Sequence, residues 1–362
     1  MTDNVLTIVE NNIGRIRLNR PRALHALTPD MCGAIVDALL RWAEDDGVFA
    51  VMIDHLPAPD GDPKLSRGFC AGGDIALIAA SAKDDCVEAE RFFHLEYRMN
   101  HLLFAYPKPI AAFIDGIVMG GGVGLSLPAR FRIATERTVF AMPETGIGLF
   151  PDVGGGWFLP RLPGRVGAWL ATTGARIDGA DCIAVGLATH YIPSDRLDAV
   201  KARILIDPSG LEDILNENMI PPPPSRLEAA RPDIDRLFAS DRAEEIAAAL
   251  EVDGSEWAQQ QRAILATKSP QTIKVALRQL EKGAAMDSFA DNMVMEYGLA
   301  CAVLRRPDFV EGVRAVIIDK DNAPRWQPAT LVEVGDALID AIFKPLPADR
   351  AWTPLPQVAH RR

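Results

Sequence analysis

Glycine, proline and acidic residues are concentrated between Gly116 and Gly164, and this run constrains the fold more than any other part of the chain. Glycine lets a backbone approach a ligand closely and present N–H groups that no side chain covers. Glu144 and Asp152 are the acids nearest to the glycine clusters. Because acids beside free backbone donors can act as a nucleophile or a base, we expect the chemistry of the protein in this run.

The first half of the chain alternates between strand patterns and helical patterns. The pair Asn11-Asn12 is a hairpin turn signal, and Thr28 followed by Pro29 is a helix start signal. The expected strands are Leu6–Glu10, Gly14–Leu18, Ala50–Ile53, Pro109–Ile114 and a pair formed by Phe131–Ala134 with Val139–Ala141, and the expected helices are 29–42, Val87–Phe104 and Gly122–Leu127. Short strands alternating with helices predict an α/β fold.

The sequence changes character near Ile206. The four prolines at 221–224 predict a stiff spacer, and the apolar periodicity beyond them is helical. The expected helices are Glu244–Leu250, Glu256–Thr267, Gln271–Lys282, Met286–Leu304 and Phe309–Ile318. We therefore divide the chain into a core of residues 1–205, which carries the candidate site, and a mainly helical region of residues 206–362, which completes the pocket and offers a surface for a homo-oligomer.

Composition excludes several classes of partner. The chain has 362 residues with 38 basic and 49 acidic side chains, and its net charge of −11 disfavours nucleic acid or an anionic membrane surface as a partner. No apolar run reaches the roughly eighteen residues that would span a bilayer. The five cysteines and six histidines form no CxxC, HxH or HExxH spacing, so we expect reduced thiols and no metal site.

The N-terminal sequence MTDNVLTIVENN is acidic and continues directly into a strand pattern. It has neither the basic start and apolar core of a signal peptide nor the arginine and serine bias of a transit peptide. We therefore expect a cytoplasmic protein, although a matrix enzyme in its mature form would begin in the same way.

The glycine segments do not match the common phosphate-binding or serine-hydrolase motifs. A GxGxxG motif starting at Gly120 would need glycine at the place of Leu125, and no GxxxxGK[ST] sequence occurs. The nearest approach to GxSxG starts at Gly124 and has Pro128 in place of its last glycine. The motifs therefore support neither a nucleotide-phosphate loop nor a serine nucleophile.

Two glycine turns, at 70–74 and 119–122, each follow a short apolar strand. If the two strands are neighbours, the N–H groups of the turns converge, and a helix beginning near Gly121 adds the positive end of its dipole. Two such donors form an oxyanion hole, which suits a thioester carbonyl whose oxygen gains negative charge during reaction.

Several longer segments have a recognisable order along the chain: FCAGGDI, then PIAAFIDGIVMGGGVGLS, then AMPETGIGLFPDVGGGWFLPRLPG, and later MEYGLACAVLR and DFVEGVRAVIIDKDNAPRWQP. The first three resemble the crotonase (enoyl-CoA hydratase/isomerase) superfamily. Together with the pair Glu96-Tyr97, the later segments are similar to the 3-hydroxyisobutyryl-CoA hydrolases within it. The resemblance extends from Leu6 to about Pro328, and it implies a crotonase-like spiral of ββα units with a helical C-terminal region.

The resemblance implies roles for particular residues. The backbone N–H groups of Gly73 and Gly121 would form the oxyanion hole, and Glu96, Glu144 and Asp152 would surround the acyl group. In the family, the glutamate at the place of Glu144 is the nucleophile and forms a mixed anhydride that water cleaves, while a general-base role stays open. Asp152 would bind the acyl hydroxyl or position the water, and Glu96 would line the same pocket.

The resemblance also places the CoA part of an acyl-CoA substrate along the loop 22–27. Its contacts would come from Arg22, Ala23, Leu24, Ala71 and Gly73. The superfamily usually has asparagine where this chain has His25. No separate cofactor is implied, because CoA is part of the substrate.

One position departs from the pattern of the hydratases in this superfamily. Those enzymes use two glutamates, of which the first falls on Gly124 and the second on Glu144. A glycine has no side chain to donate or accept a proton, so the departure favours thioester hydrolysis, as in valine breakdown, over hydration. Two alternatives remain: a hydratase or isomerase in which Asp152 replaces the missing acid, and a catalytically silent CoA-binding or scaffold protein.

Overall fold

The computed structural model describes residues 2–62 and 65–356, and it begins with a hairpin. Strand β1 (Val5–Glu10) pairs antiparallel with β2 (Ile13–Leu18). Between them, Asn11 and Asn12 have φ angles of 48° and 67°. This left-handed conformation is the one that a two-residue hairpin turn needs and that asparagine tolerates, so the predicted hairpin is confirmed.

The hairpin forms one edge of a six-stranded sheet with the order β1-β2-β3-β5-β7-β10. The further strands are β3 (Ala50–His55), β5 (Ile110–Phe113), β7 (Phe131–Ala134) and β10 (His190–Tyr191). From β2 onward, neighbouring strands are parallel. Parallel neighbours need long crossover connections, and these supply the helices of the first half.

A second sheet of four strands carries the two glycine turns. Its order is β4-β6-β8-β9, with β4 (Gly68–Cys70), β6 (Ile117–Met119), β8 (Val139–Ala141) and β9 (Ile177–Asp178). Strands β4 and β6 are parallel neighbours, so the side-by-side placement on which the oxyanion-hole prediction depends is present.

The expected pairing of Phe131–Ala134 with Val139–Ala141 is wrong. Strand β7 pairs with β5 and β10 in the larger sheet, whereas β8 pairs with β6 and β9 in the smaller one. Between them, the backbone N–H of Thr135 donates to the hydroxyl of Thr138 at 2.8 Å in a tight turn. This turn carries the chain from one sheet to the other, so each strand finds its neighbours elsewhere.

Four helices connect the strands of the first half: α1 (Pro29–Glu44), α2 (Ile75–Ala82), α3 (Val87–Phe104) and α4 (Gly121–Ser126). The Thr28 hydroxyl accepts the N–H of Met31 at the start of α1, so the predicted N-cap is confirmed. Helix α3 packs against α1 and α2 and turns Phe92 and Phe93 into the core.

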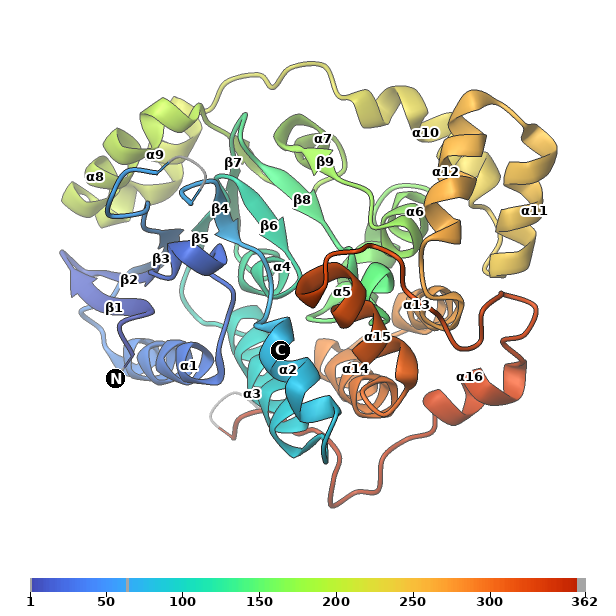
Figure 1. The fold of residues 1–362 in the computed structure, drawn as a ribbon. Coiled ribbons are helices and arrows are strands. Elements are labelled where there is room, and N and C mark those ends of the chain that lie inside the picture. The colour runs from blue at the N-terminus through green and yellow to red at the C-terminus, as the bar shows by residue number, and fades with distance from the viewer. Residues whose placement is uncertain (1, 63–64, 357–362) are drawn as a thin grey trace.

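The rest of the described chain is mainly helical. Its helices are α5 (Gly155–Phe158), α6 (Val166–Thr173), α7 (Gly179–Ala184), α8 (Leu197–Ile206), α9 (Leu211–Asn218), α10 (Arg226–Leu237), α11 (Ala243–Asp253), α12 (Glu256–Ala266), α13 (Pro270–Ala284), α14 (Phe289–Val303), α15 (Pro307–Val313) and α16 (Asp336–Ile342). The prolines at 221–224 lie in the extended stretch between α9 and α10 along the upper edge of Figure 1. None of the described helices is long and apolar enough to cross a membrane.

Two of the predicted helix boundaries need correction. Helix α14 begins at Phe289 and not at Met286, because the Ser288 side chain accepts the N–H of Asp291 and caps the helix there. The pattern Phe309–Ile318 is not one α-helix, since α15 ends at Val313 and a π-helical segment, Arg314–Ile318, follows it.

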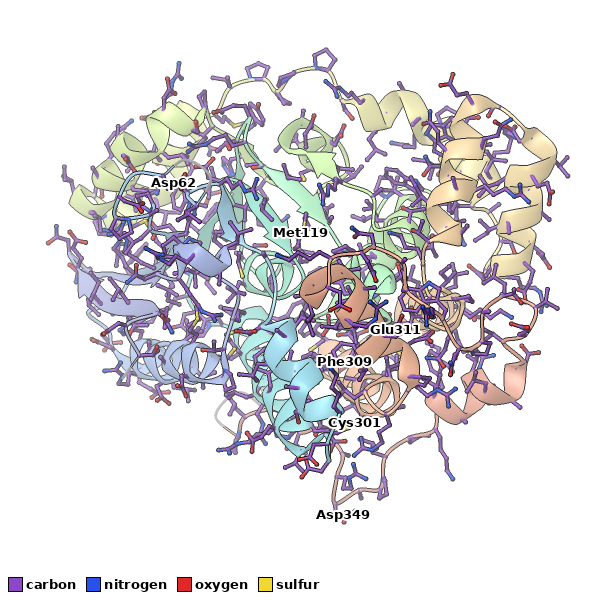
Figure 2. All side chains as sticks on the ribbon, in the orientation of Figure 1. Asp62, Met119, Cys301, Phe309, Glu311 and Asp349 are labelled. Carbon is purple, nitrogen blue, oxygen red and sulfur yellow. The ribbon has the colours of Figure 1, made fainter. Side chains whose placement is uncertain are left out.

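The C-terminal helices share a core with the first half of the chain. Helix α13 packs against α5 and α6, α14 against α3, and α15 against α2. Figure 2 marks Cys301 on α14 and Phe309 on α15, and both side chains are buried. One apolar cluster joins Phe92 and Phe150 with residues of these helices. The division at residue 205 stays a prediction.

Candidate active site

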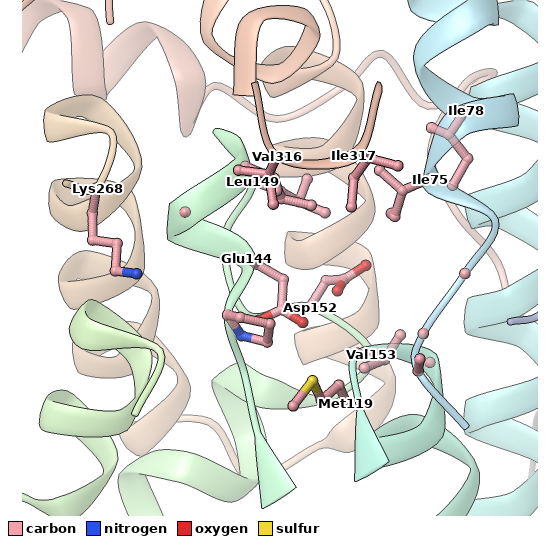
Figure 3. A pocket seen from close by; sticks show the side chains of 18 of the residues that line it. Ile75, Ile78, Met119, Glu144, Leu149, Asp152, Val153, Lys268, Val316 and Ile317 are labelled. Atoms are coloured by element: carbon pink, nitrogen blue, oxygen red, sulfur yellow. The ribbon is translucent and has the colours of Figure 1, made fainter. Parts of the chain in front are cut away.

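A cavity of about 490 Å³ lies where β4 and β6 end. The first half of the chain contributes both glycine turns and the three acids Glu96, Glu144 and Asp152. The C-terminal region contributes Thr267, Lys268, Val316, Ile317, Asn322 and Pro324. Figure 3 shows Glu144 and Asp152 side by side in the middle of this cavity, with Val316 and Ile317 above them and Met119 below.

The two glycine turns touch each other at one side of the cavity. A Cβ atom placed on Gly72 would lie 3.7 Å from the backbone nitrogen of Gly121, and one placed on Gly120 would lie 3.3 Å from the Cα of Gly72. Within the described residues, the backbone N–H groups of Gly73 and Gly121 donate to no other protein group. Helix α4 begins at Gly121, so its positive end faces the same place. This arrangement can hold an oxyanion.

Glu144 follows β8 and Pro143 and opens a single turn of 3₁₀-helix, Glu144–Ile147. Its side chain is buried, and Oε2 has no hydrogen-bond partner among the described residues. Oε1 lies next to the second glycine turn, because a Cβ placed on Gly120 would be 3.3 Å from it. Burial, followed by the nearby Asp152, raises the pKa of Glu144 well above its ordinary value. The Glu144 carboxylate therefore holds a proton more tightly than an exposed glutamate does. One of its oxygens accepts no hydrogen bond from the described residues and lies near the oxyanion donors.

Asp152 follows Pro151, and its side chain accepts the hydroxyl hydrogen of Tyr97 at 2.8 Å. Asp152 is not the N-cap of α5, because Gly154 takes that position and no side chain caps the helix. Burial raises the pKa of Asp152 to about 7, against the opposing effect of the Tyr97 hydrogen bond. This acid can therefore change its protonation state near neutral pH.

Glu96 projects from α3 into the same cavity, although most charged residues of a long helix face solvent. It is buried, and its Oε1 has no hydrogen-bond partner among the described residues. A Cβ placed on Gly121 would lie 2.5 Å from this oxygen, so Glu96 lies directly against the second glycine turn. Burial, and then Asp152, raises the pKa of Glu96. The cavity thus contains three acids that oppose one another's ionisation.

The space beside Gly124 is filled. A Cβ placed there would lie 2.5 Å from Asn100 Nδ2 and 2.8 Å from the Cβ of Val153. Both distances are far below ordinary contact, so the present packing leaves no room for a longer side chain at this position. Asn100 and Val153 therefore occupy the space that the acid of the hydratase pattern would need.

The loop predicted to bind CoA lies next to the first glycine turn. The N–H of Ala71 donates to the carbonyl of Leu24, and the N–H of Leu27 donates to the carbonyl of Gly72. Ala71 and Gly73 line the cavity, whereas Arg22, Ala23 and Leu24 lie outside its lining. Arg22 is exposed at the 3₁₀ turn Pro21–Ala23. The loop is thus placed at the edge of the cavity.

His25, which stands where the superfamily has asparagine, is buried inside this loop. Its Nδ1 accepts the backbone N–H of Arg20 at 3.0 Å, and its ring packs against that of His55 with centroids 5.3 Å apart. Burial, and then His55, lowers the pKa of His25 to about 3. A neutral ring holding the loop's own backbone fits these contacts, so His25 is part of the loop's internal structure.

Three features of the cavity were missed by sequence reasoning. Tyr97 donates to Asp152 from outside the lining, Lys268 and Arg176 add cations, and Val316 with Ile317 forms an apolar cover. Tyr97 had a signal, since it is the neighbour of Glu96 in the sequence. Lys268, Val316 and Ile317 had none, because they reach the cavity only through the packing of α12 and the segment after α15. In the described part of the chain, no group of three or more histidine, cysteine or acidic side chains is placed to hold a metal ion.

Curated relatives match nearly the whole chain. The protein named 3-hydroxyisobutyryl-CoA hydrolase, mitochondrial, of Danio rerio is 44% identical over 348 residues, which cover 92% of this chain and 87% of that protein. The protein of the same name from Homo sapiens is 41% identical, with 95% and 89% covered. These names correct the expectation of a cytoplasmic protein, because both relatives are described as mitochondrial and the N-terminal pattern had not separated the two compartments.

Solved structures and a family model establish the fold and the family. A carnitinyl-CoA dehydratase from Mycobacterium thermoresistibile superposes with a TM-score of 0.90 at 40% identity, covering 96% of this chain and 98% of that one. An enoyl-CoA hydratase from Rhodobacter sphaeroides gives 0.87 at 36% identity, with 97% and 100% covered. The predicted crotonase-like α/β fold with a helical C-terminal region is confirmed. Since the enoyl-CoA hydratase/isomerase model also matches residues 13–343, the chain belongs to the enoyl-CoA hydratase/isomerase family.

Proposed function

We propose that this protein hydrolyses the thioester of 3-hydroxyisobutyryl-CoA, or of a close β-hydroxyacyl-CoA, to the free acid and CoA. One observation carries the proposal: the buried Glu144 lies beside the oxyanion donors, while the place of the second hydratase acid, at Gly124, is filled by Asn100 and Val153. The names of the curated relatives support the same reaction and substrate. The sequence resemblance implies that this reaction belongs to valine breakdown.

In the covalent route, a carboxylate oxygen of Glu144 attacks the thioester carbonyl carbon. Negative charge develops on the carbonyl oxygen and is stabilised by the N–H groups of Gly73 and Gly121. The C–S bond then breaks, and CoA leaves as a thiolate that takes a proton from solvent. Water attacks the resulting mixed anhydride, which releases the acid and restores the Glu144 carboxylate. In the general-base route, Glu144 instead takes a proton from the water that attacks the thioester directly.

Asp152 and Glu96 supply the polar side of the acyl pocket, and Tyr97 holds Asp152 from outside the cavity lining. We assign Asp152 the acyl hydroxyl or the attacking water, since its carboxylate is fixed by Tyr97 and can exchange a proton near neutral pH. Glu96 offers an unpaired oxygen for the same hydroxyl. A site built to pair with a hydroxyl leaves its own polar groups unpaired with an analogue that lacks it, so simple acyl-CoAs are expected to be poor substrates.

The CoA part would follow the loop 22–27 from the cavity to the surface. Ala71 and Gly73 lie at the cavity end of this path, and Arg22 is exposed for a phosphate group. We further propose that residues 206–362 complete the pocket over the core of residues 1–205 and offer a surface for self-association. Light scattering of the purified protein tests that last part.

Hydration of an enoyl-CoA is the second candidate, because the two solved structures named above are described as a dehydratase and a hydratase. That reaction would need Asp152 to replace the acid that is missing at Gly124. The hydrogen bond from Tyr97 favours hydroxyl or water binding by Asp152, and either function can use it.

A substrate comparison separates these candidates. The purified protein is mixed with 3-hydroxyisobutyryl-CoA and, separately, with crotonyl-CoA, while free thiol and enoyl absorbance are followed. Thiol release from the first compound alone is the expected result. Loss of enoyl absorbance without thiol would overturn the proposal, and no reaction with either compound would favour a silent CoA-binding protein.

A second experiment distinguishes the two roles of Glu144. A single turnover in H₂¹⁸O is followed by mass spectrometry of the peptide that contains Glu144, with hydroxylamine added in a parallel sample. Label in the Glu144 carboxylate, or a hydroxamate at that residue, identifies the mixed anhydride. Label only in the released acid, with no hydroxamate on the protein, favours a general base, provided that a mixed anhydride would be attacked at the Glu144 acyl carbon.

A further inference from the structure

Glu296, on the inner side of α14, is a carboxylate buried away from solvent yet hydrogen-bonded on both oxygens. Oε2 accepts the backbone N–H of Gly154 at 2.8 Å, and Oε1 accepts that of Gly156 at 2.9 Å. Oε1 also accepts from Nδ2 of Asn292 at 2.9 Å and from Nε2 of Gln279 at 3.1 Å. Burying a charged group is costly unless it is paired in this way, so the contacts account for an acid in this position.

The segment that Glu296 holds is the one that carries Asp152. Residues 151–156 leave the cavity wall and enter α5, and Val153 and Gly154 within them have φ angles of 51° and 95°. A β-branched residue at positive φ is strained, and the conformation persists only where the surroundings fix it. Gln279 contributes to this, because the same Nε2 that donates to Glu296 also donates to the carbonyl of Pro151 at 2.7 Å. The loop is therefore fastened on both sides of Asp152.

Neither Glu296 nor Gln279 is among the described residues that line the cavity. Both come from the C-terminal region, on α14 and α13. Asp152 itself is linked to the first half of the chain through Tyr97 of α3. Tyr97, in the first half of the chain, thus bonds the Asp152 side chain directly. Glu296 and Gln279, in the C-terminal region, hold the backbone of the loop that carries it.

We propose that Glu296, assisted by Gln279, is the positioning residue for Asp152. By binding the amides of Gly154 and Gly156, it fixes the strained loop and sets where the Asp152 carboxylate stands relative to Glu144 and the substrate. This inference rests on the proposed hydrolytic function for its kinetic test. A structural role in capping α5 alone would affect stability without a specific link to Asp152.

A double-mutant cycle tests that link. Glu296→Gln keeps the shape of the side chain but offers an N–H₂ group to one of the two amides, so one hydrogen bond is lost. We expect E296Q to lower kcat/KM for the hydroxyacyl-CoA by about 10- to 100-fold, because small displacements of a reacting group have effects of this size. In the Asp152→Asn background, the same change is expected to lower it by less than about 3-fold, since the group that it positions has already been lost.

The control is Asp181→Asn. Asp181 is another buried carboxylate that joins two segments, accepting the hydroxyl of Ser225 and the N–H of Leu227, and it lies outside the cavity lining. The kcat/KM of the D181N variant is expected to equal that of the unaltered protein. An equal loss from E296Q with and without D152N, or an equal loss from D181N, would overturn the positioning role.

Two further arms keep the test decisive. Hydrogen exchange of the peptide covering residues 151–158 is expected to be faster in E296Q than in D181N, and this readout needs no activity. Unchanged exchange would contradict the inference, whereas failure of the unaltered protein to release thiol would contradict the proposed function. If E296Q does not fold, Gln279→Met removes the bond to Pro151, with an expected loss of about 3- to 10-fold that also vanishes in the D152N background.

Discussion

The two sides of the cavity are built in different ways. On one side, β4 and β6 end in glycine turns, and the chemistry is that of backbone N–H groups placed by neighbouring strands. On the other side, Asp152 stands on a strained loop whose conformation depends on Gln279 and Glu296, more than a hundred positions away in the sequence. The conformation of the glycine turns follows from residues close together in the sequence. The conformation of the Asp152 loop requires contacts from the C-terminal helices. The oxyanion side should therefore tolerate changes in the C-terminal helices better than the acid side does.

The largest effect is expected from substitution of Glu144, the group that reacts between the oxyanion side and the acid side of the cavity. Glu144→Gln keeps the shape of the side chain and removes the carboxylate required by either catalytic route. We expect kcat to fall by at least about 10³-fold, with substrate binding retained. Steady-state thiol release measures this, with D181N as the matched carboxylate control. A loss below tenfold would show that the reaction does not pass through Glu144.

The acid side is tested next by Asp152→Asn. We expect kcat/KM for the hydroxyacyl-CoA to fall by about 10²-fold, the scale of a lost acid or base. Discrimination against the matching acyl-CoA without the hydroxyl should shrink as well, because Asp152 no longer pairs with that group. Assays of both substrates give the two ratios. If discrimination stayed unchanged while the rate fell, Asp152 would act on water alone.

The pH dependence of stability sharpens the same contrast. Burial raises the pKa of Asp152 to about 7, so between about pH 4 and pH 7 the folded protein binds a proton that the unfolded chain has released. The free energy of unfolding should therefore fall as pH rises through this window, by up to about 4 kcal/mol from this group. D152N should make the change less steep, and the remaining slope is expected from Glu96, Glu144 and Glu296, whose pKa values are also raised by burial. Urea unfolding at pH 5 and pH 8 measures it, and an equally steep change in D152N would assign it to other groups.

A smaller effect is expected at Gly124. Gly124→Ala places a Cβ against Asn100 and Val153, so we expect the free energy of unfolding to fall by about 1–3 kcal/mol through overpacking. Gly33→Ala is the matched control, because it lies inside α1 with no atom near the added Cβ, and it should stabilise by about 0.5–1 kcal/mol. Gly124→Glu restores the acid of the hydratase pattern, and enoyl-CoA hydration by that variant would show that the packing of Asn100 and Val153 can give way to a longer side chain.

The smallest effect concerns the apolar cover. Ile317 lines the cavity but is 41% exposed, so Ile317→Ala should raise KM by about 3-fold and leave the free energy of unfolding within about 0.5 kcal/mol. Its neighbour Ile318 is 50% exposed and outside the cavity lining, so Ile318→Ala should change neither quantity. Identical kinetics for the two variants would show that the side chain of Ile317 does not contribute to substrate binding.

The parts of the fold that were predictable depend on residues close together in the sequence. The Asn11-Asn12 turn, the Thr28 cap and the span Val87–Phe104 follow from local conformational preference, and the structure has all three. The pairing of β7 with β8 was predicted from proximity and is wrong, because each strand bonds to partners brought in by crossovers. Strand partners depend on the path of the chain, which local patterns do not contain.

The residues of the candidate site also fall into those that sequence motifs predict and those that only packing brings together. Gly73, Gly121, Glu144 and Asp152 lie in motifs with a known order, and the structure gathers them around one cavity. Glu96 was harder, since a charged residue in a long helix usually faces solvent, and only the structure shows that this one is buried against the Gly121 turn. The contacts of Lys268, Val316 and Glu296 depend on how distant helices settle against the core. No spacing along the chain encodes that.

The fastening of the Asp152 loop has a consequence for the order of events during synthesis. The ribosome releases Glu144 and Asp152 long before Gln279 and Glu296 have been made, and nascent chains fold from the N-terminus onward. The oxyanion turns can form early, but the acid loop must wait for α13 and α14. The protein should therefore gain activity only when its last third has emerged, so that an unfinished chain would carry the acids named here without being an enzyme.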